Sequence, residues 1–356
     1  MSRRAGTAVL PAAGVLLVVL RVVVVAGLAV GLVVGLAACA APSGPTSPPV
    51  PPSASASSAS ASSASASSAS ASSASASAGA PSAGAPTCNA AASYAPVGPL
   101  PQPGRMPEGS AMARIAARGR LIVATSGDKP LLAARDPRTG DLAGIDIDLA
   151  RAVAAAIFGD PSKVDFRTVP YAAREQVLVD GQVDMVAHSM TMTCDRWTRI
   201  GFSSEYFRDG QRLLVRTDST AREVEDLAGQ RVCVARGTTT IDNLRRFPRL
   251  VVVPVDDAAD CLVLFQRGEV DALTGNEIVL LGYRMQDPWA KLIGRNLSDE
   301  PRGLAFRRDD VDLIRFVNGV LEHLRADGAL SRILASRLTP LGLPVAVRPP
   351  VYGRLP

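Results

Sequence analysis

Aromatic residues and lysine are scarce in this chain of 356 residues. Phe, Trp and Tyr together make up 4% of the sequence, and nearly all of the 38 basic residues are arginine. Nucleic-acid recognition usually needs a concentrated basic face with aromatic side chains on which bases can stack. The formal net charge of +5 includes three arginines in an acid-free stretch before residue 39, so the remainder carries about +2. We therefore expect no nucleic-acid partner.

Histidine is also scarce, and the sequence shows no set of residues typical of a catalytic centre. Only His188 and His323 occur, and the cysteine spacings match no zinc pattern. Acids such as Glu175, Glu205 and Glu277 are present, but no Ser-His-Asp set, phosphate loop or pair of catalytic carboxylates stands out. We expect no metal and no cofactor, and the sequence does not favour an enzyme.

A long apolar run occurs near the N-terminus. Arg3, Arg4 and Arg21 precede residues 22–35, which have the length of a signal-peptide core. The run ends in the sequence LAAC at residues 36–39, which resembles the bacterial lipoprotein box. A transmembrane helix is the alternative, but Arg21 disfavours it because a charge in the middle of a span costs several kcal/mol. We predict a signal peptide over residues 1–38, lipidation of Cys39 and a place on the extracytoplasmic face of the cell membrane.

The next segment has low complexity. Residues 40–86 are almost entirely Ser, Ala, Pro and Gly, with Ser-Ala repeats between 53 and 78. Such a segment buries too little apolar surface to offset its chain entropy, so we predict a disordered tether over residues 39–110. As a flexible coil of about 48 residues, its low-complexity part spans roughly 35–40 Å.

Four cysteines remain after Cys39. An even number in an exported domain suggests two disulfides, and four cysteines allow three pairings. Cys233 lies in an expected strand and Cys261 in the helix of the next βα unit, which favours the pair Cys233–Cys261. The remaining pair, Cys88–Cys194, would fix the end of the tether to the folded part.

From residue 112 onward, short β-branched runs alternate with helical stretches. Strands are expected at 121–124, 164–169, 183–187, 212–215, 231–235, 250–254 and 271–274. Helices are expected at 147–158, 172–180, 241–246, 258–266 and 313–326. This alternation predicts parallel sheets built from βαβ units, in two lobes that face a cleft where a small ligand binds.

Several motifs resemble those of the family 3 extracellular solute-binding proteins, the amino-acid receptors of ABC importers. GIDIDLA at residues 144–150 resembles the family's signature, and the whole ordered set of motifs is more specific than any one of them. The order of the other motifs agrees with the family: RLIV at 120–123 comes before GIDIDLA, and VDM at 183–185, TMTCDR at 191–196, FS at 202–203 with Tyr206, GTT at 237–239 and VDA at 270–272 come after it. The sequences DPRTG at 136–140 and TCDR at 193–196 are most similar to glutamate- and glutamine-binding lipoproteins.

The resemblance covers about residues 110–340 and implies an α/β, periplasmic-binding-protein-like fold. Lobe one is expected over residues 111–213, with a return over 305–340. Lobe two is expected over 214–304, and a C-terminal tail over 341–356.

A free amino acid carries a carboxylate and an ammonium, and each needs a partner once a closing cleft has removed its water. In lobe one, Arg196 offers a planar fork to the carboxylate and Thr191 a hydroxyl, near an expected helix start. In lobe two, the resemblance assigns the same carboxylate to the loop of Thr238 and Thr239. Considered outside the motif order, Arg196 would be a surface ion pair and the GTT loop at 237–239 a simple helix N-cap.

The ammonium site departs from the family. Members commonly place an Asp shortly after the VDA strand, where this chain has Asn276. Three alternatives stay open: the amide oxygen of Asn276, the carboxylate of Glu277, or a different binding mode. The carbonyl of Ser189 is the expected partner in lobe one.

Side-chain selectivity is expected from cations in the cleft. Lys129, Arg174 and Arg236 would favour an acidic ligand if they face it, although each alone is as well explained as a solvated charge. His188 is expected to be a buried histidine rather than a residue that contacts the ligand.

These residues predict a monomeric binding protein that delivers glutamate, aspartate, glutamine or asparagine to the permease of an ABC importer. The alternatives are a subunit that presents its ligand to a membrane receptor or kinase pathway, and an enzyme on the same fold.

Overall fold

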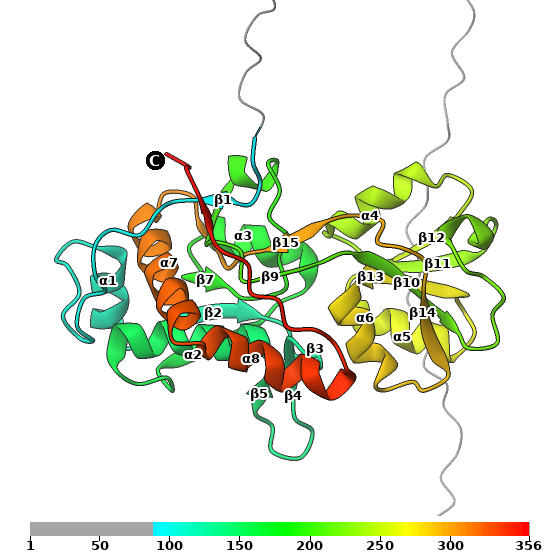
Figure 1. Ribbon diagram of the computed structural model, residues 1–356, viewed down its shortest axis with the longest axis horizontal. Helices are drawn as coiled ribbons and strands as arrows, with labels where there is room; N and C mark the ends of the chain where they lie inside the picture. Colours follow the sequence, from blue (N-terminus) through cyan, green and yellow to red (C-terminus); the bar gives the residue numbers. More distant parts are fainter. Residues whose placement is uncertain (1–87, 356) are drawn as a thin grey trace, which may run out of the picture. The chain divides into compact units, whose positions relative to one another are not determined.

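The structure, a computed structural model, describes residues 88–355. This part of the chain forms two α/β lobes, and the chain passes from one to the other twice (Figure 1). The predicted signal peptide, the predicted lipidation site Cys39 and residues 40–87 of the predicted tether lie outside the described residues.

Lobe one is built on a mixed five-stranded sheet. Its strands, in spatial order, are β6 (Val164–Thr168), β2 (Leu121–Thr125), β7 (Met185–Val186), β16 (Ala305–Arg307) and β8 (Ile200–Phe202). Its helices are α1 (Ala111–Arg118), α2 (Ile145–Phe158), α3 (Arg174–Val179), α7 (Val311–Ala326) and α8 (Ala329–Leu338). Strand β2 runs parallel to β6 and β7, and most of its side chains are buried, as in a strand that is covered on both faces.

Helix α2 begins within the GIDIDLA motif. Ile145, Leu149 and Val153 recur every four residues and are fully or almost fully buried, so they give the helix one apolar face. Gly144 precedes the helix with φ 139°, and a Cβ there would lie 2.2 Å from the carbonyl oxygen of Leu132. Only glycine permits this approach, which fixes where α2 begins.

Lobe two is built on a second five-stranded sheet. Its strands, in spatial order, are β12 (Val251–Val255), β11 (Arg231–Ala235), β13 (Ala272–Asn276), β10 (Gln211–Arg216) and β14 (Ala290–Ile293). Its helices are α4 (Thr239–Asn243), α5 (Ala258–Gln266) and α6 (Glu277–Arg284). Since β10 already belongs to this sheet, lobe two begins near Gln211, earlier than the predicted residue 214.

Two short antiparallel strands join the lobes. They are β9 (Phe207–Asp209) and β15 (Glu300–Arg302), with Asp209 opposite Glu300. An isolated bridge also pairs Arg302 with Thr191 of lobe one. The hinge strands therefore lie directly beside the TMTCDR loop.

The chain between β2 and α2 forms a small antiparallel sheet that was not predicted. It consists of β3 (Asp128–Lys129), β4 (Ala133–Arg135) and β5 (Leu142–Ala143). Strands of two or three residues carry no alternating apolar pattern, which explains why periodicity does not reveal them.

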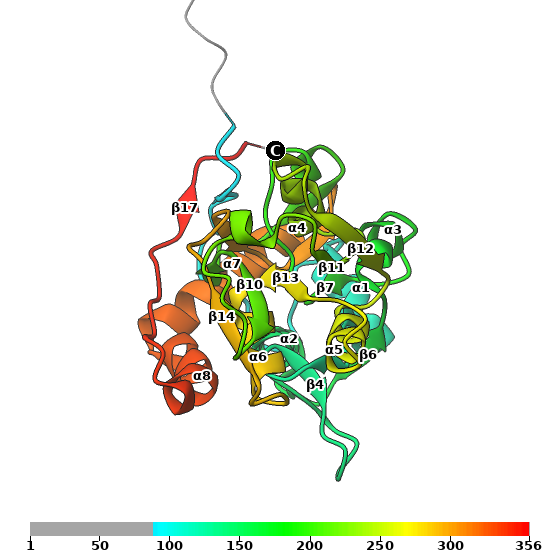
Figure 2. The same cartoon turned by 90° about the vertical axis from the view of Figure 1, so that its right-hand side faces the viewer.

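The prediction that the tether extends to residue 110 is wrong for residues 88–110. Strand β1 (Ala92–Ser93) pairs in parallel with β17 (Val351–Tyr352) of the C-terminal segment, and both run along lobe one (Figure 2). Ser93 is fully buried, and its hydroxyl donates a hydrogen bond of 2.7 Å to the Phe202 carbonyl. We call residues 88–95 together with 351–354 the collar.

The indole of Trp197, which directly follows the TMTCDR loop, contacts the collar. Trp197 Nε1 donates to the Ala90 carbonyl at 2.8 Å, and the Arg354 guanidinium lies 3.7 Å from the centre of the indole ring. Tyr94 packs edge-on against the same ring. Residues 88–95 and 351–354 are thus ordered by a shared partner that lies far from both segments in the sequence.

Both predicted disulfides are present in the structure. Cys233 on β11 pairs with Cys261 on α5, and Cys88 in the collar pairs with Cys194 in the TMTCDR loop. Within residues 88–355, no helix combines the length and apolar character needed to cross a membrane.

Replacing Cys88 and Cys194 together by serine is expected to lower the free energy of unfolding by roughly 2–4 kcal/mol. The reason is that the bond closes a loop with a sequence separation of 106, and so restricts the unfolded chain. Urea denaturation followed by circular dichroism measures the change.

The matched control replaces Cys233 and Cys261 by serine. Hydrogen exchange at the β1 amides should quicken only in the first variant, because only that bond holds the collar. Unchanged stability and unchanged exchange in the first variant would contradict the role of the collar bond.

Candidate functional site

The two lobes meet at the carbonyl group of Gly237. Arg174 Nη2 donates to this oxygen at 2.8 Å and Arg196 Nη2 at 3.2 Å, both from lobe one. Gly237 has φ 68°, and a Cβ there would lie 2.6 Å from the Cα of Ala172. Glycine is therefore needed twice, for its left-handed backbone and for the close approach of the lobes.

Arg196 is held on three sides. It is 6% exposed, its Nε donates to Glu175 Oε1 at 3.0 Å, and its Nη1 donates to the Thr191 carbonyl at 2.9 Å. The predicted helix start at this point is wrong, because Arg196 begins only a single 3₁₀ turn that ends at Thr198. The guanidinium itself, rather than a helix terminus, supplies the positive charge at this place.

Arg174 and Lys129 flank one aromatic ring. The Arg174 guanidinium carbon and Lys129 Nζ each lie 4.5 Å from the centre of the Tyr171 ring. Both cations are almost completely buried, and Lys129 also pairs with Asp128. Burial lowers the pKa of Arg174 to about 9, with the charge of Arg196 as the next cause. Among residues 88–355, no carboxylate forms an ion pair with Arg174, which binds carbonyl oxygens instead.

Ser189 has a strained backbone at the centre of this region. It is the only non-glycine residue with positive φ, 50°, in the described part of the chain. Its N–H donates to Asp146 Oδ2 at 2.8 Å, and its carbonyl accepts from Arg302 Nη1 at 3.0 Å. Asp146 also accepts the Tyr206 hydroxyl at 2.6 Å, and burial raises the pKa of this carboxyl group.

This network shows what the GIDIDLA motif does locally. Asp146 reaches from α2 to the Ser189 amide, and Arg302 reaches from β15 to the Ser189 carbonyl, so α2 and the hinge hold the loop between them. Arg302 is in turn paired with Asp209 at 2.6 Å. The sequence motif identified Asp146, but nothing in the pattern assigned it this contact.

The two threonine sites come together across the lobes. Thr239 Oγ1 donates to Glu300 Oε2 at 2.9 Å and lies 3.5 Å from Thr191 Oγ1. Thr238 instead turns its hydroxyl to the Ala235 carbonyl at 2.7 Å. Thr191 and Thr239 therefore face each other, while Thr238 shapes the loop that carries Thr239.

A small cavity of about 20 Å³, with room for roughly one water molecule, lies beside this contact. Tyr171, Thr238, Asn276 and Tyr283 are among the residues that line it. Asn276 Nδ2 and the Tyr283 hydroxyl are buried there without a hydrogen-bond partner. Buried polar atoms are rarely left unpaired, so these two atoms mark a place for a polar molecule.

Two predicted site residues lie elsewhere. Glu277 forms an ion pair of 2.9 Å with Arg212 and lines a different groove, so it does not line the small cavity. Arg236 is about half exposed and pairs with Asp256 at 2.9 Å, so it does not reach the cavity. In each case a nearby opposite charge, which spacing alone does not reveal, directs the side chain away.

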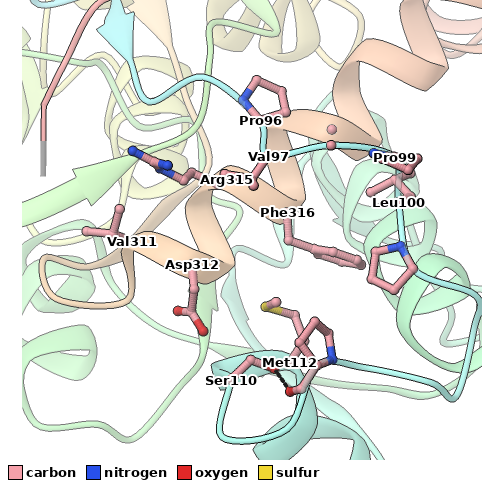
Figure 3. Close-up of a pocket in the computed structure, with 14 residues that line it drawn as sticks. Pro96, Val97, Pro99, Leu100, Ser110, Met112, Val311, Asp312, Arg315 and Phe316 are labelled. Carbon is pink, nitrogen blue, oxygen red and sulfur yellow. Dashed lines mark hydrogen bonds between the residues drawn. The ribbon is translucent and has the colours of Figure 1, made fainter.

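A larger cavity of about 590 Å³ lies within lobe one, between the segment that follows β1 and helices α1 and α7. Figure 3 shows Val97, Pro99 and Leu100 on one wall and Met112 on the other, with Phe316 between them. Its walls are largely apolar and come from one lobe only. It is therefore separate from the polar contact between the lobes.

Some residues at the interface have no counterpart in the sequence prediction. They are Glu300, Tyr171, Tyr283, Asp209 and Arg302. The recognised motifs end at residue 272, before the hinge strand β15. The aromatic residues stand in no recognisable motif, and only the fold brings them to the interface.

Two α/β sheets joined by hinge strands, with facing polar loops between them, define the periplasmic-binding-protein class of fold. The chain belongs to the bacterial extracellular solute-binding proteins, family 3, whose family model matches residues 121–337. The collar lies outside the matched residues, on both sides.

The relatives agree with this family. The ABC transporter glutamine-binding protein GlnH of Bacillus subtilis is 30% identical over 224 residues, covering 62% of this chain and 82% of the relative. The glutamate-binding protein GluB of Corynebacterium glutamicum is 30% identical over 233 residues, covering 62% and 79%. Holo ArgBP from T. maritima has a TM-score of 0.57 and 29% identity, covering 62% of this chain and 98% of that structure.

His188 is expected to make stability depend on pH. The ring is buried, its Nε2 lies 2.9 Å from the Val169 carbonyl, and it packs against Tyr171. Burial, followed by the charges of Lys129 and Arg174, holds the pKa of His188 well below 6.5.

Below about pH 6.5 the unfolded chain takes up a proton that the folded protein does not. The free energy of unfolding should therefore fall by roughly 1.4 kcal/mol for each pH unit below 6.5, until the lowered pKa is reached. Urea denaturation between pH 7.5 and 5.5 measures the slope, and His188→Gln should flatten it. His323→Gln, which changes the exposed histidine, is the matched control and should keep the slope of the unchanged protein. Equal slopes for the unchanged protein, His188→Gln and His323→Gln would refute this prediction.

Proposed function

We propose that the protein is an extracytoplasmic amino-acid-binding protein that delivers a polar or acidic amino acid to the permease of an ABC importer. Membership of the solute-binding family supports binding without chemical turnover. The names of two relatives, a glutamine-binding protein of an ABC transporter and a glutamate-binding protein, support the ligand class.

The contact of Arg196, Thr191 and Thr239 carries the proposal. The guanidinium of Arg196 and the hydroxyl of Thr191, both buried in lobe one, lie opposite the partly buried hydroxyl of Thr239 from lobe two. A planar guanidinium and hydroxyl donors suit a carboxylate, the group shared by all amino acids. Because both lobes contribute, a ligand held between them stabilises the closed arrangement, which a permease can then recognise.

The cations around Tyr171 favour ligands with an acidic or amide side chain. Arg174 and Lys129 are both buried within the same region, and Arg174 has only carbonyl partners. Bringing a basic side chain beside them would add like-charge repulsion at low dielectric. We therefore propose glutamate, aspartate, glutamine or asparagine as the ligand and exclude arginine from the proposal.

We further propose that Cys39 carries the lipid that holds the protein at the membrane. The LAAC sequence at residues 36–39 and the preceding apolar run support this anchor. The first described residue, Cys88, is bonded to lobe one, so the tether would join the folded part there.

Binding of the twenty amino acids, measured by isothermal titration calorimetry, tests the function. At least one of the four proposed ligands should bind with a stoichiometry of one. Arg196→Ala should weaken that binding at least about 100-fold, because it removes a charged hydrogen-bonding fork from a buried site.

The matched control is Arg236→Ala, which changes an arginine next to Gly237 that pairs outward with Asp256. It should leave the affinity within about twofold. Equal affinities for the Arg196 variant and the unchanged protein would refute the assignment of the site.

Changing Cys39 to serine tests the anchor. Full-length protein expressed in a bacterium that processes lipoproteins should then move from the membrane fraction to the soluble exported fraction. Cys88→Ser is the control and should stay with the membrane. Membrane association unchanged in the Cys39 variant would show that lipidation does not hold the protein there.

A further inference from the structure

A bound amino acid needs an acid for its ammonium group, and the expected position does not supply one. Asn276 is neutral, and Glu277 pairs with Arg212 away from the cavity. A buried ammonium without a carboxylate would lose its hydration without compensation. If the proposed function holds, another acid must lie at the interface.

Glu300 is a buried carboxylate beside the threonine pair. It is 1% exposed, and its two oxygens accept hydrogen bonds from the hydroxyls of Thr239, at 2.9 Å, and Ser298, at 2.6 Å. No ion pair involving Glu300 occurs among residues 88–355. The nearest basic residue on its own strand, Arg302, is already bound to Asp209 and Ser189.

A buried carboxylate with no cationic partner is expensive to retain. Residues of this kind persist in proteins where a ligand or a reaction requires them. The two hydroxyl groups that contact Glu300 orient it without neutralising it. The carboxylate is therefore placed to pair with a cation that enters between the lobes.

The position of Glu300 suits a zwitterion. Thr239 links it to Thr191, and the Thr191 carbonyl accepts the Arg196 guanidinium at 2.9 Å. A positive group and a negative group thus stand on two sides of Thr191. That separation of charge is the complement of an amino acid's carboxylate and ammonium.

We propose that Glu300, supplied by the hinge strand β15, is the acid that neutralises the ammonium of the bound amino acid. Asn276 then contributes only its neutral amide to the cavity. The assignment rests on the proposed function and adds a specificity-determining residue to it. It also makes the hinge itself part of the site, so that ligand and hinge geometry are directly coupled.

The test compares each of the four amino acids with its counterpart that lacks the amino group: L-glutamate with glutarate, L-aspartate with succinate, L-glutamine with glutaramate, and L-asparagine with succinamate. The protein should bind its amino acid roughly 10- to 100-fold more tightly than the counterpart, the range for a hydrogen bond to a charged group. In Glu300→Gln, the affinity for the amino acid should fall by that factor, so that the affinities for the amino acid and its counterpart become nearly equal.

Two further variants test whether Glu300, and not Asn276 or any other buried acid, meets the ammonium. Asn276→Ala should keep the preference for the amino acid, because its amide carries no charge. Glu205→Gln is the matched control, since Glu205 is also buried but is paired with Arg208 at 3.0 Å, and it should leave the preference unchanged.

Stability gives an independent readout. Without ligand, Glu300→Gln should have a Tm equal to or above that of the unchanged protein, because it removes an unpaired buried charge. Glu205→Gln should have a lower Tm. Should Glu300→Gln fail to fold, Glu300→Asp, which withdraws the carboxylate by one methylene group, must weaken amino-acid binding in the same direction.

The assignment is overturned if Glu300→Gln still prefers the amino acid by tenfold or more, or if Asn276→Ala is the variant that loses the preference. Either result leaves the proposed function intact, since the amino acid still binds. Failure of all four amino acids to bind the unchanged protein is a different outcome, which refutes the proposed function and this assignment with it.

Discussion

Two buried guanidinium groups, those of Arg174 and Arg196, converge on the single carbonyl oxygen of Gly237. Removing guanidinium groups from water is costly, so each must find oxygen partners, and the lobe-two loop supplies one only when the lobes touch. This constraint explains why the loop carries glycine at the point of contact. It also explains why the surrounding residues are polar in an otherwise apolar interior.

The rest of the interface serves to hold these groups in place. Asp146 and Arg302 fix the strained Ser189 loop from α2 and from the hinge, and the collar fixes the TMTCDR loop from outside through Cys88 and Trp197. Local strain at Ser189 is maintained by several contacts at once, as is common where a backbone must be positioned for binding. The collar lies outside the residues that the family model matches, so this support comes from segments on both sides of the matched region.

The sequence predicted the architecture well because its signals are periodic. The buried face of α2 and the β-branched strands follow from spacing along the chain, and the ordered motifs from their resemblance to a family. The pairing Cys233–Cys261 followed from placing the two residues in consecutive βα units. Arg196, Thr191 and Thr239 were identified because they lie within motifs. What spacing cannot give is the direction of a charged side chain: Arg236 and Glu277 are turned away by Asp256 and Arg212, which only the folded chain brings near. Likewise, residues 88–110 resemble a linker in composition, and their order depends on Trp197 and the C-terminal segment.

The central claim is that the polar contact between the lobes is a ligand site that closes on an amino acid. Hydrogen exchange, measured with and without the amino acid that binds, tests it most directly. The account predicts that amides of residues 189–196 and 237–240 exchange more slowly with ligand, in both lobes together, while those of β1 in the collar do not change. Protection confined to one lobe, or to the apolar cavity between α1 and α7, would contradict it.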